Sequence, residues 1–147
     1  MSVAISGPPD AIRGSRVDVA SLRRRARRVL SAIGEARSEL SIALVTDAEI
    51  AELNARWRDR ASPTDVLSFS LVEGSHSVHR GGLLGDVVIS VETAARQAAE
   101  RHRALDEIVT RLLIHGVLHL VGHDHEEDEE ARRMEGEERR VWRSVRG

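Results

Sequence analysis

The chain has 147 residues, which is the length of one domain, and it contains no cysteine, so disulfides, thiolate metal sites and a cysteine nucleophile are excluded. Hydrophobic residues make up 41% of the chain and charged residues 31%, which is typical of a globular protein. No signal peptide or membrane span is evident, and the net charge of −2 argues against a general nucleic-acid coat. We therefore expect one cytoplasmic domain over residues 1–147.

Hydrophobic periodicity predicts strands and helices that alternate along most of the chain. In chain order we expect a strand at 17–19, a helix at 19–33, a strand at 40–45, a helix at 46–57, strands at 66–72 and 86–90, and helices at 91–102, 105–121 and 126–145. The loop between the last two strands is too short for a crossover, so this pair should be antiparallel, whereas helical connections should join parallel strands. The expected fold is α+β, with a mixed four-stranded sheet and about five helices.

The expected helix at 105–121 is apolar nearly all round in its second half, which predicts a helix buried against the sheet. The exceptions are His115 and His119, which stand at i and i+4 on one face, so both imidazoles can reach one metal ion. Gly122 can end the helix and turn the chain back, and His125 follows it as a third ligand. Three imidazoles with an open position are typical of catalytic zinc, although nickel and copper also suit imidazole.

Other assignments of the histidines stay open at this point. Core histidines in a buried helix would need no metal, but three at this spacing favour a metal site. His123 could replace His125 as the third ligand, although it follows the glycine directly and has less chain with which to turn back. Asp124 could orient a ligand imidazole or cap the last helix. His76 and His79 are weak evidence for a second metal site in a long loop.

The spacing H-x-x-x-H-x-x-G-x-x-H is that of the metzincin proteases, whose metal helix carries a glutamate directly after the first histidine. That glutamate acts as the general base. Here Gly116 occupies its position, so a peptidase of this class would lack its base. The sequence therefore has the metal-binding pattern of a metzincin without its protease chemistry.

The segment from His115 to His125 resembles the signature of the YbeY family, bacterial metal-dependent endoribonucleases of ribosomal RNA maturation. Blocks at 52–58, 63–69 and 84–90 are similar to further family blocks, in the same order, so the resemblance covers about residues 17–143. Ser70 stands where proline is common in the family. Residues 1–16 match nothing, and we expect a poorly defined N-terminal segment there.

The resemblance implies one zinc ion per chain, held by His115, His119 and His125, and an active-site arginine at Arg58. His115 and Arg58 would then act in catalysis. The implied activity is cleavage of single-stranded RNA, in 16S ribosomal RNA 3′-end maturation and ribosome quality control. Partners would be small-subunit ribosomal RNA and the small ribosomal subunit with its proteins, but neither DNA nor a membrane. Two alternatives remain: a zinc hydrolase of another substrate, and an assembly factor with structural zinc.

Arginines crowd the first expected helix, where Arg23 with Arg27 and Arg24 with Arg28 form like-charge pairs at i and i+4. Such pairs are destabilising, and an RNA backbone would relieve the repulsion. We therefore interpret these four residues as RNA contacts, against the alternative of a solvated face neutralised by nearby acidic residues.

Aromatic residues are scarce, at 2% of the chain. We expect Trp57 and Phe69 in the core rather than stacked on bases. With so little aromatic surface, stacking should contribute little to the reading of base identity.

Overall fold

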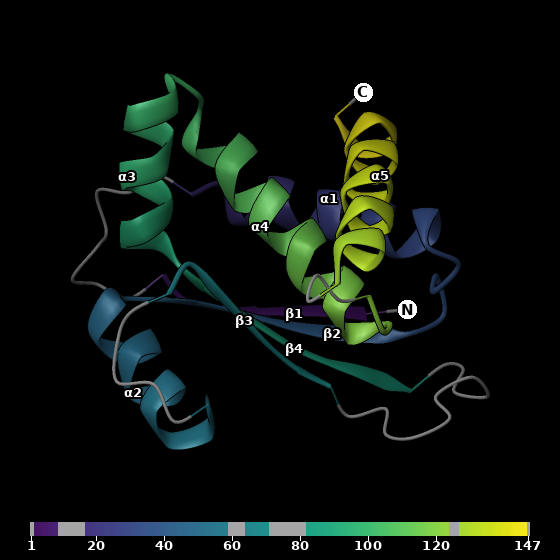
Figure 1. The fold of residues 1–147 in the computed structure, drawn as a ribbon. Helices are drawn as coiled ribbons and strands as arrows, with labels where there is room; N and C mark the ends of the chain where they lie inside the picture. The colour runs from purple at the N-terminus through teal and green to yellow at the C-terminus, as the bar shows by residue number, and fades with distance from the viewer. Residues whose placement is uncertain (1, 9–16, 59–63, 71–81, 124–126, 147) are drawn as a thin grey trace.

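The computed structural model describes residues 2–8, 17–58, 64–70, 82–123 and 127–146 (Figure 1). In this part of the chain one sheet contains β1 (Ser2–Ser6), β2 (Glu39–Val45), β3 (Val66–Ser70) and β4 (Leu83–Ser90), in the order β1-β2-β4-β3. The pairs β1–β2 and β2–β4 are parallel, and β3–β4 is antiparallel. This confirms the mixed sheet and its antiparallel pair.

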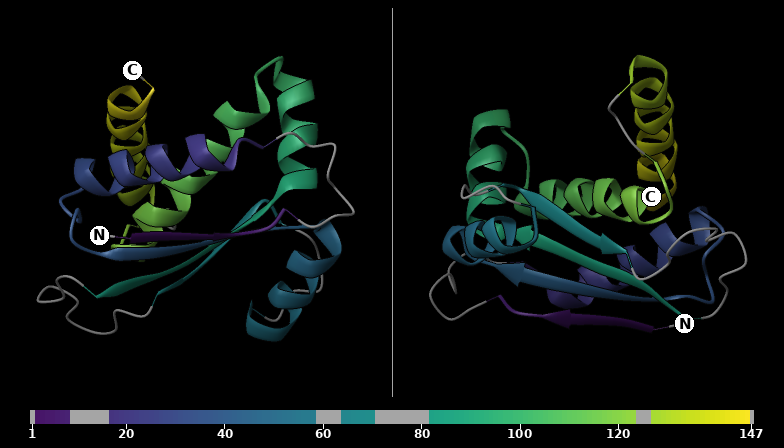
Figure 2. Two further views of the ribbon diagram at one scale, coloured as in Figure 1. Left: turned by 180° about the vertical axis from the view of Figure 1, so that it is seen from behind. Right: turned by 60° about the horizontal axis from the view of Figure 1, so that its bottom comes forward.

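The described part of the chain also contains the five expected helices. They are α1 (Val19–Ala32), α2 (Asp47–Arg58), α3 (Val91–Arg101), α4 (Leu105–Leu120) and α5 (Asp128–Val145). Figures 1 and 2 show α1, α4 and α5 on one face of the sheet and α2 on the other. None of these helices is long and apolar enough to cross a membrane.

The expected strand at 17–19 is wrong, because this segment leads into a helix. The carboxylate of Asp18 accepts a hydrogen bond from the backbone N–H of Ser21 at 3.0 Å and caps the start of α1. The fourth strand is instead β1, within the N-terminal segment that we expected to be poorly defined. It lies at the edge of the sheet, where few large apolar side chains are needed, and Val3 anchors it with 6% of its surface exposed.

Helix α4 is the centre of the main core, as its composition predicts. Ten of its sixteen residues are buried, on several sides of the helix. It lies across the sheet between α3 and α5 (Figure 1). On the other face of the sheet, Ile50 of α2 packs with Leu67 and Val88 in a second, small cluster.

The two aromatic side chains assigned to the core behave differently. Phe69 packs against the small cluster below the sheet, as expected. The expectation for Trp57 is wrong, because 63% of its surface is exposed at the end of α2. Only one face of α2 packs on the sheet. The last turn of the helix, which carries Trp57, lies beyond the core.

Candidate active site

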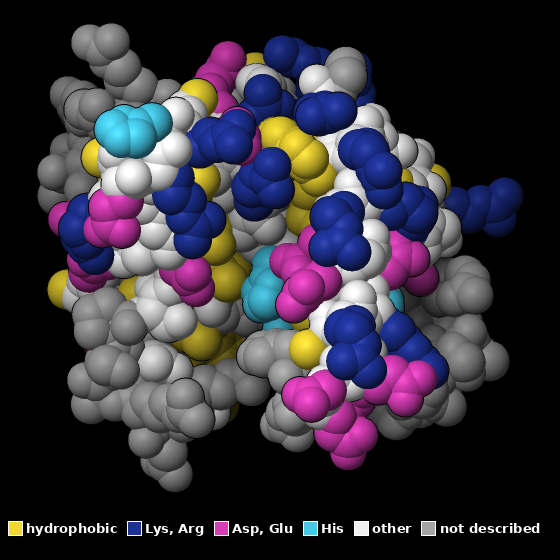
Figure 3. Space-filling view, turned by 45° about the horizontal axis from the view of Figure 1, so that its top comes forward, with side chains coloured by type: hydrophobic (Ala, Val, Ile, Leu, Met, Phe, Trp, Pro, Cys, Tyr) yellow, Lys and Arg dark blue, Asp and Glu magenta, His cyan; other side chains and the backbone are white. Residues whose placement is uncertain are grey.

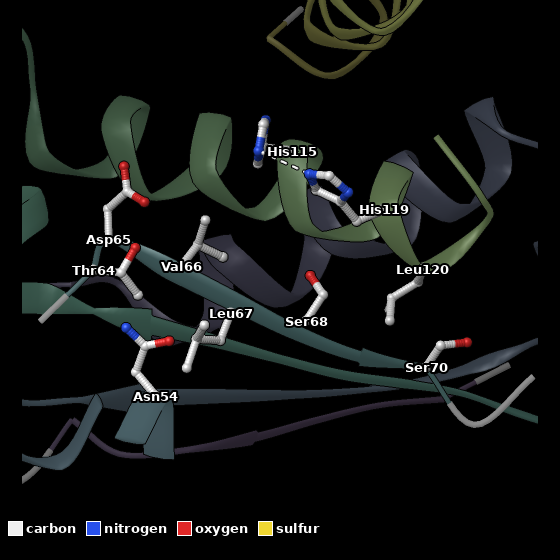
Figure 4. A pocket seen from close by; sticks show the side chains of 10 residues that line it. All are labelled: Asn54, Thr64, Asp65, Val66, Leu67, Ser68, Ser70, His115, His119 and Leu120. Carbon is white, nitrogen blue, oxygen red and sulfur yellow. Dashed lines mark hydrogen bonds between the residues drawn. The ribbon is translucent and has the colours of Figure 1, made fainter. Parts of the chain in front are cut away.

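His115 and His119 lie side by side on the face of α4 that borders a cavity of about 740 Å³. Their Nε2 atoms are 3.2 Å apart, and the ring planes meet at 73°. Figure 4 shows both rings above β3, which contributes the opposite wall of the cavity together with Asn54 of α2. The remaining lining residues are Thr64, Asp65, Val66, Leu67, Ser68, Ser70 and Leu120.

Glu138 of α5 contacts the first histidine from the side away from this cavity. Its Oε2 atom is 3.0 Å from Nδ1 of His115. Sequence reasoning missed this carboxylate, although the chain contains a signal for it. Met134, Val141 and Val145 form the buried stripe of α5, and Glu138 interrupts that stripe at helical spacing.

Gly116 lets α4 approach the sheet closely beside the histidines. A Cβ atom at this position would lie 2.7 Å from Val87 and 3.0 Å from the hydroxyl oxygen of Ser68. The Ser68 hydroxyl donates a hydrogen bond to the carbonyl of Gly116 at 2.9 Å. The residue that replaces the metzincin glutamate therefore faces the sheet, and its lack of a side chain is required for packing.

The turn after α4 has the form that the sequence predicts. Gly122 has a φ angle of 103°, and its N–H donates to the carbonyl of His119, while the N–H of His123 donates to the carbonyl of Leu118. These two hydrogen bonds define a Schellman motif, which ends the helix and turns the chain. The side chain of His123 lines a hollow with Glu130 of α5, separate from the cavity of the other two histidines.

Several expected site residues lie outside the described part of the chain. They are His125, Asp124, His76 and His79. Among the residues that the structure describes, no three histidine or acidic side chains gather as metal ligands. The third metal ligand therefore stays a prediction, as does the separate site at His76 and His79.

Arg58 is the last residue of α2, and its side chain is not described. Its backbone position follows Asn54 by one helical turn, and residues at this spacing share a helix face. Asn54 is 5% exposed and borders the cavity. The polar lining residues Asn54, Thr64 and Ser68 were not assigned to the site from sequence, although they belong to the blocks that resemble the YbeY family.

The arginines of α1 are only partly available to a ligand. Arg23 donates to the carbonyl of Val3 at 3.3 Å, and Arg28 donates to the carbonyl of Val145 at 3.2 Å. Arg24 and Arg27 are exposed. The face of α1 therefore includes structural contacts as well as free surface, and the proposed RNA contacts there stay predictions.

A second group of arginines stands closer to the histidines. Arg101 of α3, Arg111 of α4 and Arg139 of α5 line a groove of about 390 Å³ that His115 also borders. The same groove is lined by the carboxylates of Asp65, Glu135 and Glu138. Arg111 is paired with Glu107 at 3.0 Å, whereas Arg101 and Arg139 have no ion pair with any residue in the described ranges. Figure 3 shows this face, where arginine side chains flank a hollow that leads to a histidine.

Comparison with known proteins identifies the family of the chain. The model of the family described as endoribonuclease YbeY matches residues 11–146. The chain belongs to the YbeY endoribonuclease family. This confirms the resemblance carried by the histidine block and extends it at both ends. The expectation that residues 1–16 match nothing is wrong for residues 11–16, which the family model includes.

Individual YbeY relatives are similar over most of the chain. A protein named endoribonuclease YbeY from Anaeromyxobacter sp. (strain Fw109-5) is 50% identical over 123 residues, which are 84% of this chain and 62% of that relative. The chain thus spans less than two thirds of the length of that relative. A YbeY relative from Syntrophotalea carbinolica is 40% identical over 91% of both chains.

A solved structure supports the YbeY fold. The solution structure of TM1509 from Thermotoga maritima is 28% identical, with a TM-score of 0.65 over 97% of this chain and 88% of that one. The overall fold of this chain is therefore shared with a solved protein.

Proposed function

We propose that the protein is a zinc-dependent endoribonuclease that cleaves single-stranded RNA, with the small-subunit ribosomal RNA as its substrate in 16S 3′-end maturation and ribosome quality control. The names of its family and relatives support RNA as the substrate. The small ribosomal subunit and its proteins would then be partners, and the site of action would be the cytoplasm.

The metal assignment depends on the distance between the Nε2 atoms of His115 and His119. Two nitrogens bound to one tetrahedral zinc at about 2.0–2.1 Å stand about 3.3–3.4 Å apart. The Nε2 atoms of His115 and His119 are 3.2 Å apart and border the same cavity. A carboxylate on the far nitrogen, as Glu138 provides for His115, is typical of metal-ligating histidines. The donor set therefore fits zinc.

We propose His125 as the third ligand. The Schellman turn at Gly122 redirects the chain directly after α4, which supports a ligand from the following segment. His123 lines a different hollow, which supports a place for it outside the ligand set. When bound, the zinc ion would activate water and supply positive charge beside the scissile phosphate.

Polar and cationic groups around the cavity could contact an RNA backbone, although Asp65, Glu135 and Glu138 place acidic groups beside them. Asn54, Thr64 and Ser68 offer neutral hydrogen-bond groups at its wall, and the Arg101–Arg111–Arg139 groove adjoins it at His115. Guanidinium groups bind phosphate oxygens in a planar, bidentate way. Arg58, on the same face of α2 as Asn54, would stabilise the charge that develops on the phosphate during cleavage.

Metal analysis combined with RNA cleavage tests this function. The wild-type protein should contain one zinc per chain and cleave a single-stranded RNA, while His115→Ala and His125→Ala should lose both properties. His123→Ala is the matched control and should keep them. Zinc loss in His123→Ala together with zinc retention in His125→Ala would show that the third ligand is wrong. Cleavage that persists in a folded, zinc-free His115→Ala protein would overturn the metal-dependent mechanism.

A further inference from the structure

We propose that Glu138 is a positioning residue for the metal site: its carboxylate holds the ring of His115 in one orientation and one tautomer, so that Nε2 presents its lone pair to the cavity. The inference is based on the contact between Glu138 Oε2 and His115 Nδ1, which are 3.0 Å apart. Its part in metal binding rests on the function proposed above, whereas the choice of tautomer concerns the metal-free protein as well.

The position of Glu138 on α5 requires a hydrogen-bond donor for its carboxylate. Met134, four residues earlier, is 1% exposed, and Val141, three residues later, is fully buried, so Glu138 stands on the face of the helix that meets the core. A carboxylate there loses part of its hydration and needs a hydrogen-bond donor. The imidazole of His115 is that donor, and the two side chains are 31% and 32% exposed.

The chemistry of the pair selects the tautomer. An ionised carboxylate has no proton to give, so it can only accept a hydrogen bond. The proton between the two groups therefore belongs to Nδ1 of His115. In a neutral imidazole only one nitrogen is protonated, so Nε2 is left unprotonated and can act only as an acceptor. The other tautomer would place the lone pair of Nδ1 against a negative charge.

The same reasoning extends to His119. Its Nε2 is 3.2 Å from Nε2 of His115. Because Nε2 of His115 can only accept, Nε2 of His119 donates in the neutral, metal-free protein. A chain of two hydrogen bonds then runs from His119 through His115 to Glu138. Nε2 of His115 already has the unprotonated form that a metal ligand needs, whereas His119 must move its ring proton to Nδ1, which also ends the hydrogen bond between the two rings.

Nitrogen-15 NMR of the histidine rings in the metal-free, full-length protein tests this arrangement directly. The spectra are recorded at about pH 8.5 and compared with a second set at higher pH, so that the signals of the neutral rings are identified from the data themselves. The wild-type protein should show His115 protonated at Nδ1 and His119 protonated at Nε2. Finding the neutral His115 ring protonated at Nε2 would overturn the proposal without the need for any variant.

Three variants separate positioning from a general structural role. Glu138→Ala should lose the Nδ1 tautomer of His115, whereas Glu138→Gln should keep it, because the amide carbonyl can still accept the hydrogen bond. Glu137→Ala is the matched control: it removes the same charge from the next residue, whose carboxylate pairs with Arg140 at 2.7 Å instead. If Glu138→Ala keeps the wild-type tautomer while folded, Glu138 does not position His115.

Zinc affinity, measured by competition with a coloured chelator, gives the second readout. Loss of an outer partner of a ligating histidine typically weakens metal binding by about 10- to 100-fold. We expect this loss in Glu138→Ala, a much smaller one in Glu138→Gln, and none in Glu137→Ala. Equal affinity in Glu138→Ala and Glu137→Ala would overturn the role in metal binding. A wild-type protein with the expected tautomers that binds no zinc would refute the proposed function and leave the positioning of His115 intact.

Discussion

Gly116 of α4 lies so close to Val87 of β4 that a Cβ atom on the glycine would be 2.7 Å from the valine Cγ1 atom. Val87 is fully buried and its branched side chain has little freedom to move away. The close approach places the helix, and with it His115 and His119, directly over β3. A glutamate could not stand at this position without displacing the helix, which argues against a peptidase that uses the metzincin base.

Gly116→Ala should therefore destabilise the protein. Overpacking of a core typically lowers the free energy of unfolding by about 1–3 kcal/mol, and the better helix propensity of alanine returns up to about 1 kcal/mol. We expect a net loss of about 1–2 kcal/mol in urea unfolding. Gly136→Ala in α5 is the matched control, because a Cβ atom added to Gly136 would meet nothing within 4 Å. Gly136→Ala should stabilise the protein by up to about 1 kcal/mol, and equal effects of the two changes would contradict the packing role of Gly116.

Arg58→Ala should lower the turnover of single-stranded RNA on the order of 100- to 1,000-fold, because it removes a cation from the transition state. The melting temperature and zinc content should stay at their wild-type values. Arg56→Ala serves as control, since Arg56 lies in the same helix turn, is exposed, and pairs only with Glu52 at 3.3 Å in the described part of the chain. Normal turnover in Arg58→Ala would remove this residue from the active site.

Substitution of the two groove arginines without ion pairs should weaken RNA binding. The double variant Arg101→Gln with Arg139→Gln removes two cations from the groove beside His115. Each lost phosphate contact on a single strand should reduce the salt dependence of log affinity by about 0.7. Binding titrations at several salt concentrations, in the presence of a chelator, measure this slope. An unchanged slope would mean that the RNA does not pass through the groove.

The α1 arginines are tested with Arg24→Gln and Arg27→Gln, because both side chains are exposed. Arg28 is less suitable, since its guanidinium also joins α1 to the carbonyl of Val145 in α5. The double variant should bind RNA more weakly at moderate salt, with turnover at saturating RNA nearly unchanged, because the contact is the same in the ground and transition states. Wild-type binding would assign this face of α1 to solvent. A collapse of saturated turnover would place it in the active site.

Asp47, at the start of α2, should make stability depend on acid pH. Partial burial raises the pKa of its carboxyl group, but hydrogen bonds from Ser90, Thr93 and Arg96 and the charge of Arg96 outweigh burial, so the pKa lies below its usual value of 3.8. The folded state thus favours the carboxylate, and its stabilisation is complete above the unfolded pKa and is lost as the pH falls through the lowered folded pKa.

We therefore expect Asp47→Asn to lower the melting temperature at neutral pH and to have a progressively smaller effect as the pH falls below the unfolded pKa of 3.8, toward about pH 3. Thermal unfolding followed by circular dichroism at both pH values measures the difference. Glu52→Gln, also in α2, is the control and should change little at either pH, because the carboxylate of Glu52 is 71% exposed. A constant effect of Asp47→Asn across this range would contradict the lowered pKa.

The local features of this protein were determined by its sequence. The spacing of His115 and His119 places both rings on one helix face whatever surrounds the helix, and the apolar second half of α4 requires burial. Gly122 ends the helix because its left-handed conformation suits a glycine. The blocks that resemble the YbeY family follow from residue order alone, and so does the mixed sheet with its short antiparallel connection.

Only the tertiary structure decided which distant side chains meet these features. Glu138 reaches His115 from another helix, 23 residues away, because α5 docks its buried stripe beside α4. Likewise, the closeness of Gly116 to Val87, the exposure of Trp57 and the pairing of β1 at the sheet edge depend on how whole elements pack. Helix periodicity fixes which residues share a face, but packing between elements fixes what that face touches, and this is not encoded in any local spacing.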